Sequence, residues 1–245
     1  MTAQHPVRLS SKKLPWRERL IVALDTPDAE EARKLVGQLG GAVEFYKIGL
    51  ELFMAGGYFE LLEWLHDEGK KVFVDLKFFD VPQTVGSAVR QLQGKGAIFA
   101  TVHGNDQILK AACDHKGTTK ILAVTVWTSL DNGDLRDLGF QVDARQLVLS
   151  RARRAIEIGC DGVISSGLEA SGLRDQLGQN FLIVCPGIRP VANADDQKRT
   201  VDVEEAFMNG ADYIVVGRPI RQADDPRQAA ESMQARIQKL FEPAT

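Results

Sequence analysis

Residues 71–84, KVFVDLKFFDVPQT, have the pattern of a strand followed by the start of a helix. β-Branched and aromatic residues dominate the first half, which favours a strand. Pro82 in the second half is typical of the loop and first turn that open a helix. The stretch also places Asp75, Lys77 and Asp80 within six residues. If the strand continues to Lys77, the side chains of Asp75 and Lys77 point to the same face at its C-terminal end.

The same pairing of a strand with a helix recurs along the chain. LIVALD at 20–25 is a continuous apolar run, typical of a parallel strand covered on both faces. Eight such pairs predict an α/β protein with a single (β/α)8 TIM barrel. The alternative is an open doubly wound sheet, but no Gly-x-Gly-x-x-Gly follows the first strand. We expect strands at 20–25, 45–50, 72–77, 97–103, 121–127, 161–166, 181–188 and 213–220, and helices near 29–40, 58–68, 83–93, 105–115, 143–158, 169–177, 202–209 and 226–241.

Length and composition fit one large domain. The 245 residues, 44% of them hydrophobic, could form one barrel or two small domains. No linker rich in Pro, Ser or Gly divides the chain, so one domain is favoured. Residues 1–17 lack apolar periodicity and are expected to form an N-terminal tail, to which we assign no function. Residues 18–245 are expected to form the barrel and to carry the catalytic site.

The charge and cysteine content exclude several classes of function. The net charge is −3 and no run of Lys or Arg is present, which disfavours nucleic acid and anionic membrane as partners. No apolar run approaches the roughly 18 residues of a membrane span, and the N-terminus lacks a signal-peptide core. We therefore expect a cytoplasmic protein. Cys113, Cys160 and Cys185 are odd in number and widely spaced, which favours reduced structural thiols over disulfides or a zinc site.

Charged residues stand where the predicted strands end, which in a TIM barrel is the catalytic face. The first three strands supply Asp25, Lys47, and Asp75 with Lys77. A lysine inside an apolar strand, such as Lys47, needs a partner. Lys47 and Lys77 opposite Asp75 and Asp80 would sum to zero formal charge, so these four could share one pocket. Asp80 has the opposite parity and must either fold back or project toward a second chain; a simple surface ion pair also remains open.

The later strands end on other polar groups. The fourth ends on His103, which we expect to be a hydrogen-bonded structural residue, and the fifth is followed by Thr128 and Ser129. The seventh and eighth end on PGIR at 186–189 and on GRP at 217–219. Glycine lets backbone N–H groups approach a phosphate and arginine supplies the charge, so this pair predicts a phosphate site. The segment that follows the first of them, PVANADDQ, has no apolar anchor and is expected to form a mobile lid.

Taken together, these motifs resemble those of the bacterial-type orotidine 5′-phosphate decarboxylase family. The resemblance covers about residues 20–240 and is carried by Asp25, Lys47, DxKxxDxPxT, PGIRP, Asp196-Gln197 and VGRPI, in that order. It implies a carboxy-lyase that converts orotidine 5′-phosphate (OMP) to UMP and carbon dioxide in de novo pyrimidine biosynthesis, without metal or other cofactor. It also implies a homodimer with active sites shared between two barrels.

The resemblance further implies a role for each matching residue. Lys77 would protonate C6 of the pyrimidine, and it would form the catalytic set with Asp75, Asp80 and Lys47. Asp80 and Thr84 would reach into the partner's site. The other substrate-binding residues would be Asp25 and Lys47 at the ribose hydroxyls, Thr128 beside the pyrimidine, and Arg189, Gln197, Gly217 and Arg218 at the phosphate. The lid at 190–196 is about one residue shorter than expected for the family, which weakens the assignment of Gln197.

Two other functions fit the same pattern of residues. One is a metal-dependent phosphosugar decarboxylase or epimerase on the same barrel, in which the acids would bind Mg²⁺. Lys77 between two acids argues against it, because an ammonium there competes with the cation. The other is a nucleotide-phosphate binding barrel without catalysis, which the complete set of charged residues disfavours.

Overall fold

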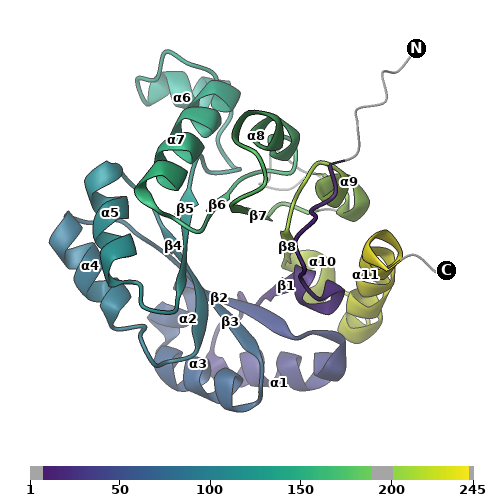
Figure 1. Cartoon of the computed structure of the whole chain (residues 1–245). Helices are drawn as coiled ribbons and strands as arrows, with labels where there is room; N and C mark the ends of the chain where they lie inside the picture. Colours follow the sequence, from purple (N-terminus) through teal and green to yellow (C-terminus); the bar gives the residue numbers. More distant parts are fainter. Residues whose placement is uncertain (1–7, 189–200, 243–245) are drawn as a thin grey trace, which may run out of the picture.

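Eight parallel strands close into a barrel in which every strand pairs with its neighbours in chain order and β8 pairs with β1. The computed structural model describes residues 8–188 and 201–242, and the helices surround the barrel (Figure 1). The predicted TIM barrel is confirmed, and the open doubly wound sheet is wrong. The strands are β1 (Leu20–Ala23), β2 (Phe45–Gly49), β3 (Lys71–Phe78), β4 (Ala97–Val102), β5 (Lys120–Val124), β6 (Gly162–Ile164), β7 (Leu182–Cys185) and β8 (Tyr213–Val216).

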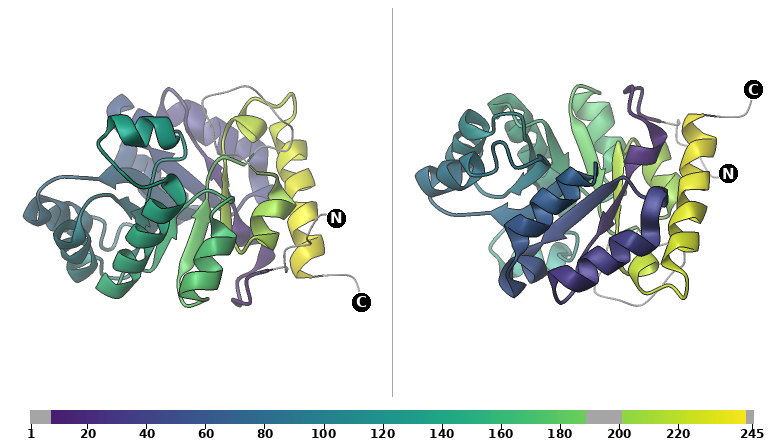
Figure 2. Two further views of the ribbon diagram at one scale, coloured as in Figure 1. Left: turned by 90° about the horizontal axis from the view of Figure 1, so that it is seen from above. Right: turned by 90° about the horizontal axis from the view of Figure 1, so that it is seen from below.

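A helix follows each strand on the outside of the barrel, and the last helix packs against the first, which completes the ring (Figure 2). The main helices lie within one or two residues of the expected bounds, because their caps and apolar periods are local features, except that the helix expected at 83–93 ends three residues early, at Arg90. They are α1 (Ala29–Leu39), α3 (Tyr58–Asp67), α4 (Pro82–Arg90), α5 (Asp106–His115), α7 (Ala144–Ile158), α8 (Ala170–Leu177), α9 (Val203–Met208) and α11 (Pro226–Phe241).

Short helices also form where we expected none, and one of them replaces the end of the eighth strand, which we expected at 213–220 but which ends at Val216. Each has at most six residues, too few to show an apolar period in the sequence. Several of them lie after the C-terminal end of a strand, on the catalytic face of the barrel. These are α2 (Leu50–Ala55), α6 (Asn132–Asp137) and α10 (Arg218–Arg221), and two 3-10 turns cover Trp16–Arg19 (η1) and Gly40–Ala42 (η2).

The barrel interior is filled by aromatic side chains. Phe45 contacts Phe99 with ring centroids 5.1 Å apart, and Tyr213 meets the same two rings edge-on. Phe73 packs against Phe99 from β3. These side chains are almost completely buried. They form a packed floor, so the polar groups at the C-terminal ends of the strands lie above an apolar layer.

The described part of the predicted tail is held against the barrel by ion pairs. Asp212, which is completely buried before β8, accepts hydrogen bonds from Ser10 at 2.5 Å and from Lys12 at 3.0 Å. Arg174 donates to the other oxygen of Asp212 at 2.7 Å. Arg8 pairs with Asp175 on α8. Residues 8–12 are therefore attached to the barrel. Their partners lie far away in the sequence, so the sequence of the tail does not reveal them.

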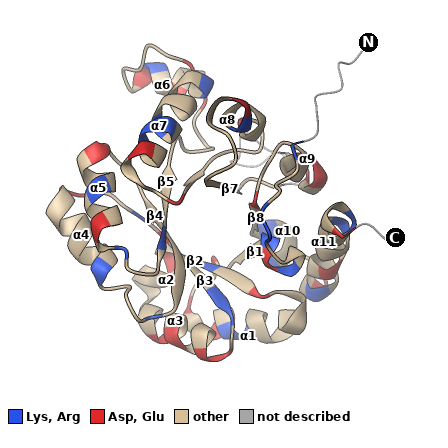
Figure 3. Cartoon of the chain, viewed as in Figure 1, with Lys and Arg blue, Asp and Glu red and all other residues tan. Residues whose placement is uncertain are grey.

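Charges of both signs are spread over the outer helices (Figure 3). Many of these residues form ion pairs within one helix, such as Lys110 with Asp114 and Arg227 with Glu231. Such exposed pairs contribute little stability. None of the helices in residues 8–188 and 201–242 has both the length and the apolar character needed to cross a membrane.

Candidate active site

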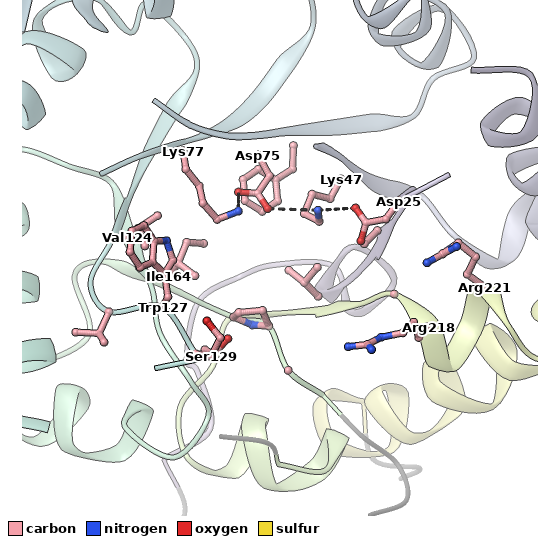
Figure 4. Close-up of a pocket in the computed structure, with 18 residues that line it drawn as sticks. Asp25, Lys47, Asp75, Lys77, Val124, Trp127, Ser129, Ile164, Arg218 and Arg221 are labelled. Atoms are coloured by element: carbon pink, nitrogen blue, oxygen red, sulfur yellow. Dashed lines mark hydrogen bonds and ion pairs between the residues drawn. The ribbon is translucent and has the colours of Figure 1, made fainter. Parts of the chain in front are cut away.

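Four charged side chains form a continuous chain of ion pairs at the C-terminal ends of β1, β2 and β3 (Figure 4). Lys47 donates to Asp25 at 3.0 Å and lies 3.3 Å from Oδ2 of Asp75. Lys77 donates to Oδ1 of Asp75 at 2.9 Å. Asp75 is thus held between two ammonium groups, one on each carboxylate oxygen. The side chains of Lys47 and Asp75 are only 12% and 13% exposed, so this chain is mostly screened from water.

The prediction that Asp75 and Lys77 point to the same face of β3 is confirmed, although the backbone is kinked at the end of the strand. Phe73, Asp75 and Lys77 alternate along the strand and all line the same cavity. Lys77 has φ of 47°, the left-handed region that a lysine rarely adopts. Thr101 on β4 stabilises this turn, because its hydroxyl accepts a hydrogen bond from the backbone N of Lys77 at 2.9 Å and donates to Asp75 at 2.8 Å. Strain of this kind concentrates at functional sites.

The fourth member of the charged chain is Asp25. Of the two arrangements left open for Asp80, folding back into the pocket of its own chain is wrong, because Asp80 does not line this cavity. The other arrangement, in which Asp80 projects toward a second chain, stays a prediction. Asp80 is exposed, accepts a hydrogen bond from the backbone N of Val81 at 2.6 Å and does not line the cavity. Thr84 is also exposed, in the first turn of α4. The physical reason is the opposite parity of Asp80, since the loop after β3 does not fold back.

The electrostatics of the buried pair keep both groups charged. Burial by itself would raise the pKa of Asp75, but Lys47 and Lys77 and the hydrogen bonds from Lys77 and Thr101 outweigh burial and hold that pKa below its usual value. Burial likewise opposes the charged form of Lys47, but Asp75 and Asp25 outweigh it and raise the pKa of Lys47. At neutral pH the site therefore holds ammonium and carboxylate groups in fixed places.

We predict that Asp75→Asn lowers the free energy of unfolding by about 3 kcal/mol at neutral pH, because it leaves Lys47 and Lys77 without their shared counter-charge. The pKa of Asp75 is lower in the folded than in the unfolded state, so its stabilisation is present above the unfolded value of about 3.9 and is lost as the pH falls through the folded value. The difference between wild type and variant should stay constant above about pH 5 and shrink below about pH 4. Urea unfolding at pH 3 to 7 measures it.

Asp137→Asn, in an exposed position on α6, is the matched control. It should leave the free energy of unfolding within about 0.5 kcal/mol of wild type at every pH. A difference for Asp75→Asn that grows on acidification would contradict the assignment of Asp75 as a carboxylate stabilised by the two lysines.

The charged chain forms one wall of a cavity of about 410 Å³. The loop after β5 supplies the opposite side, with Trp127, Thr128 and Ser129. The Trp127 ring stacks on His103 with centroids 4.8 Å apart. Nδ1 of His103 donates to the backbone oxygen of Val124 at 3.3 Å, and burial lowers the pKa of His103, so the ring is neutral at pH 7. His103 thus has the hydrogen bond we expected and supports the wall that carries Thr128.

The predicted phosphate site forms the third side of the cavity. Gly187, with φ of 76°, and Gly217 lie at the ends of β7 and β8 and line the cavity together with Arg218. A side chain on Gly217 would contact Asp25, so glycine there leaves room beside the charged chain. Arg189, Gln197 and the predicted lid at 190–196 lie outside the described residues.

Two residues of the site were missed in the sequence. Thr101 is a polar residue in an otherwise apolar strand, with the same parity as His103, and that was the available signal. Arg221 lines the cavity from α10. It stands three residues after Arg218, the spacing of one helical face, but the short helix was not predicted.

Comparison with known proteins gives a consistent result over nearly the whole chain. Residues 18–233 match the model of the orotidine 5′-phosphate decarboxylase / HUMPS family. A protein of Methylococcus capsulatus named orotidine 5′-phosphate decarboxylase is 63% identical over 238 residues, which cover 96% of this chain and 98% of that protein. One of Xanthomonas euvesicatoria with the same name is 50% identical over 227 residues, covering 91% and 93%.

A solved structure agrees with these relatives. The crystal structure of orotidine 5′-phosphate decarboxylase from Lactobacillus acidophilus has a TM-score of 0.80 and 36% sequence identity, over 90% of this chain and 99% of that one. Sequence and fold thus lead to the same group of proteins. The chain belongs to the orotidine 5′-phosphate decarboxylase / HUMPS family.

Proposed function

We propose that this protein is a carboxy-lyase that decarboxylates OMP to UMP in pyrimidine biosynthesis, with Lys77 protonating C6. The observation that carries the proposal is the chain Asp25–Lys47–Asp75–Lys77 on one wall of a cavity whose other end presents Gly217 and Arg218. The ammonium groups of the charged chain can stabilise a reacting carboxylate and the carbanion that develops from it. The glycine and arginine suit a phosphate.

The reaction leaves an electron pair at C6 of the pyrimidine when the bond to the carboxylate carbon breaks. Lys77 then gives a proton to that carbon and becomes a neutral amine, and carbon dioxide departs. Its ion pair with Asp75 fixes the direction of the ammonium group before the substrate binds. Asp75, held by Lys47 on its other oxygen, stays ionised and orients Lys77.

The energetic demand explains why the whole cavity is needed. An enzyme lowers a barrier of this kind by on the order of 20 kcal/mol. An ammonium about 4 Å from the developing charge supplies roughly 4 kcal/mol at a realistic effective dielectric. The remainder comes from a preorganised site and from binding energy at groups that do not react, the ribose and the phosphate. We assign the ribose hydroxyls to Asp25 and Lys47, the pyrimidine to Thr128, and the phosphate to Arg189, Gln197, Gly217 and Arg218.

We further propose that the reaction needs no metal or other cofactor. Each oxygen of Asp75 already accepts from a lysine, so a divalent cation there would have to displace an ammonium group. This is the specific observation against a metal-dependent phosphosugar decarboxylase or epimerase on the same barrel. The complete charged chain likewise favours an enzyme over a non-catalytic nucleotide-phosphate binding barrel.

Incubation of the purified protein with OMP, with and without a chelator, tests the function. We expect UMP to form at the same rate in both samples. Activity lost with the chelator would favour the metal-dependent alternative. Binding of OMP without turnover would favour the non-catalytic barrel.

We propose that the functional form is a cytoplasmic homodimer in which Asp80 and Thr84 complete the site of the partner. Both side chains are exposed, and neither lines the cavity of its own chain. They lie beside Phe79 and Val81, which are 65% and 63% exposed, a large apolar area for the loop of a monomer. An interface on this loop would bury that area and place a second carboxylate near Lys77 of the other chain.

A subunit-mixing experiment tests the shared site. We predict that Lys77→Ala and Asp80→Ala are each inactive alone, and that dissociated and reassociated mixtures regain activity. A mixed dimer holds both lesions in one site and neither in the other, so an equimolar mixture should recover about a quarter of the wild-type activity if subunits pair at random. Turnover measured before and after mixing gives the result.

A mixture of Lys77→Ala with wild type is the control. Random pairing in that mixture changes only the fraction of intact sites. If both variants are inactive alone and their mixture recovers no activity although mixed dimers are detected by mass, Asp80 acts within its own chain.

A further inference from the structure

Arg221 has a place in the cavity that the family resemblance does not account for. It is the last residue of α10 and stands three positions after Arg218, so the two side chains lie on one face of the short helix. Both line the cavity, and both extend toward its interior on the side opposite Lys77 (Figure 4). The backbone N of Arg221 bonds to the backbone oxygen of Gly217, which fixes the start of the side chain.

The side chain of Arg221 is partly buried, and it forms no ion pair with any residue of the part of the chain that the structure describes. Its Nε is buried, and in residues 8–188 and 201–242 it has no hydrogen-bond partner. A buried guanidinium donor without an acceptor costs free energy, so it requires an external partner. The acids of the cavity are engaged elsewhere, because Asp25 and Asp75 both accept from Lys47.

Charge balance indicates what that partner is. The described charged residues that line the cavity are four cations and two carboxylates, a formal surplus of two positive charges: Lys47, Lys77, Arg218 and Arg221 against Asp25 and Asp75. Without Arg221 the surplus would be one. A phosphate monoester carries close to two negative charges at pH 7. The cavity lining is thus rich in positive charge, to which Arg221 contributes, and this favours an anionic ligand such as a phosphate.

We propose that Arg221 is a second phosphate-binding cation, which acts with Arg218 to select a nucleoside monophosphate over the free nucleoside. This rests on the proposed function for the identity of the nucleotide. Arg218 and Arg221 together would contact different oxygens of the phosphate, and the anion would satisfy the buried Nε. The proposal makes Arg221 a specificity residue, without a role in the bond-breaking step.

Product binding tests this separately from turnover. The dissociation constants of UMP and uridine are measured for wild type, Arg221→Ala and Arg221→Gln. Removal of one charged hydrogen-bonding partner should weaken UMP binding by about 10- to 100-fold and leave uridine binding within about twofold. Gln222→Ala, an exposed neighbour at the end of α10, is the matched control and should bind both as wild type does.

The outcomes distinguish the two proposals. If wild type converts OMP and both Arg221 variants keep the wild-type preference for UMP over uridine, the role of Arg221 is overturned and the proposed function stands. If wild type fails to convert OMP but the variants lose the preference for UMP, the proposed decarboxylase function is overturned and the role of Arg221 in phosphate binding stands. An equal loss for UMP and uridine in both variants would also overturn the role of Arg221, because it would reflect damage to the pocket.

Discussion

Replacing Lys77 by alanine is expected to abolish measurable decarboxylation of OMP while leaving the barrel folded. Two contributions disappear together. The electrostatic stabilisation by an ammonium near C6 accounts for roughly 10³-fold at an effective dielectric of about 20, and the loss of a positioned proton donor for a further 10²- to 10⁴-fold. We therefore expect a loss in kcat on the order of 10⁵-fold or more. The decrease in absorbance of the orotate ring measures turnover, and circular dichroism reports on the fold.

The fold should survive because Asp75 keeps Lys47 as a partner when Lys77 is removed. Lys71→Ala is the matched control, since Lys71 lies at the other end of the same strand and pairs with Glu18. It should retain activity within a few-fold of wild type. Turnover by Lys77→Ala within 100-fold of wild type would show that another group protonates the product.

Replacing Arg218 by alanine is expected to lower kcat/KM for OMP by about 10³-fold or more, the second largest effect we predict. A bidentate arginine–phosphate contact is among the strongest charged hydrogen bonds, and binding energy at a group that does not react is used to lower the barrier at the reacting carbon. The loss should therefore affect kcat as well as KM. For orotidine, which has no phosphate, the same variant should match wild type.

Arg227→Ala is the control for the removal of an arginine, because Arg227 is exposed on α11 and pairs only with its helical neighbour Glu231 among the described residues. It should leave both substrates unaffected. A loss of less than tenfold in kcat/KM for OMP in Arg218→Ala would show that other residues bind the phosphate. An equal loss on orotidine would indicate a disturbed barrel end.

Much of the site followed from the identity of residues at predicted strand ends. Asp25, Lys47, Asp75 and Lys77 could be found in this way, because parallel strands in a closed barrel bring their C-terminal ends to one face. Thr101 and Arg221 were missed. The one signal for Thr101 was a polar residue inside an apolar strand, and Arg221 lies in a four-residue helix that is too short to show a period. The position of Asp80 was left open between its own pocket and a second chain, and the structure shows only that it does not line the pocket of its own chain.

The order of strands and helices, their approximate bounds and the face to which Asp75 and Lys77 point all followed from the amino-acid sequence, because periodicity, capping and strand parity are local properties. The partners of the charged groups did not. Lys47 meets Asp25 because β1 and β2 are paired, and Asp75 meets Thr101 because β4 lies beside β3. The pairing of neighbouring strands brings together residues that are more than twenty positions apart in the chain, and no local pattern specifies which carboxylate oxygen each lysine will reach.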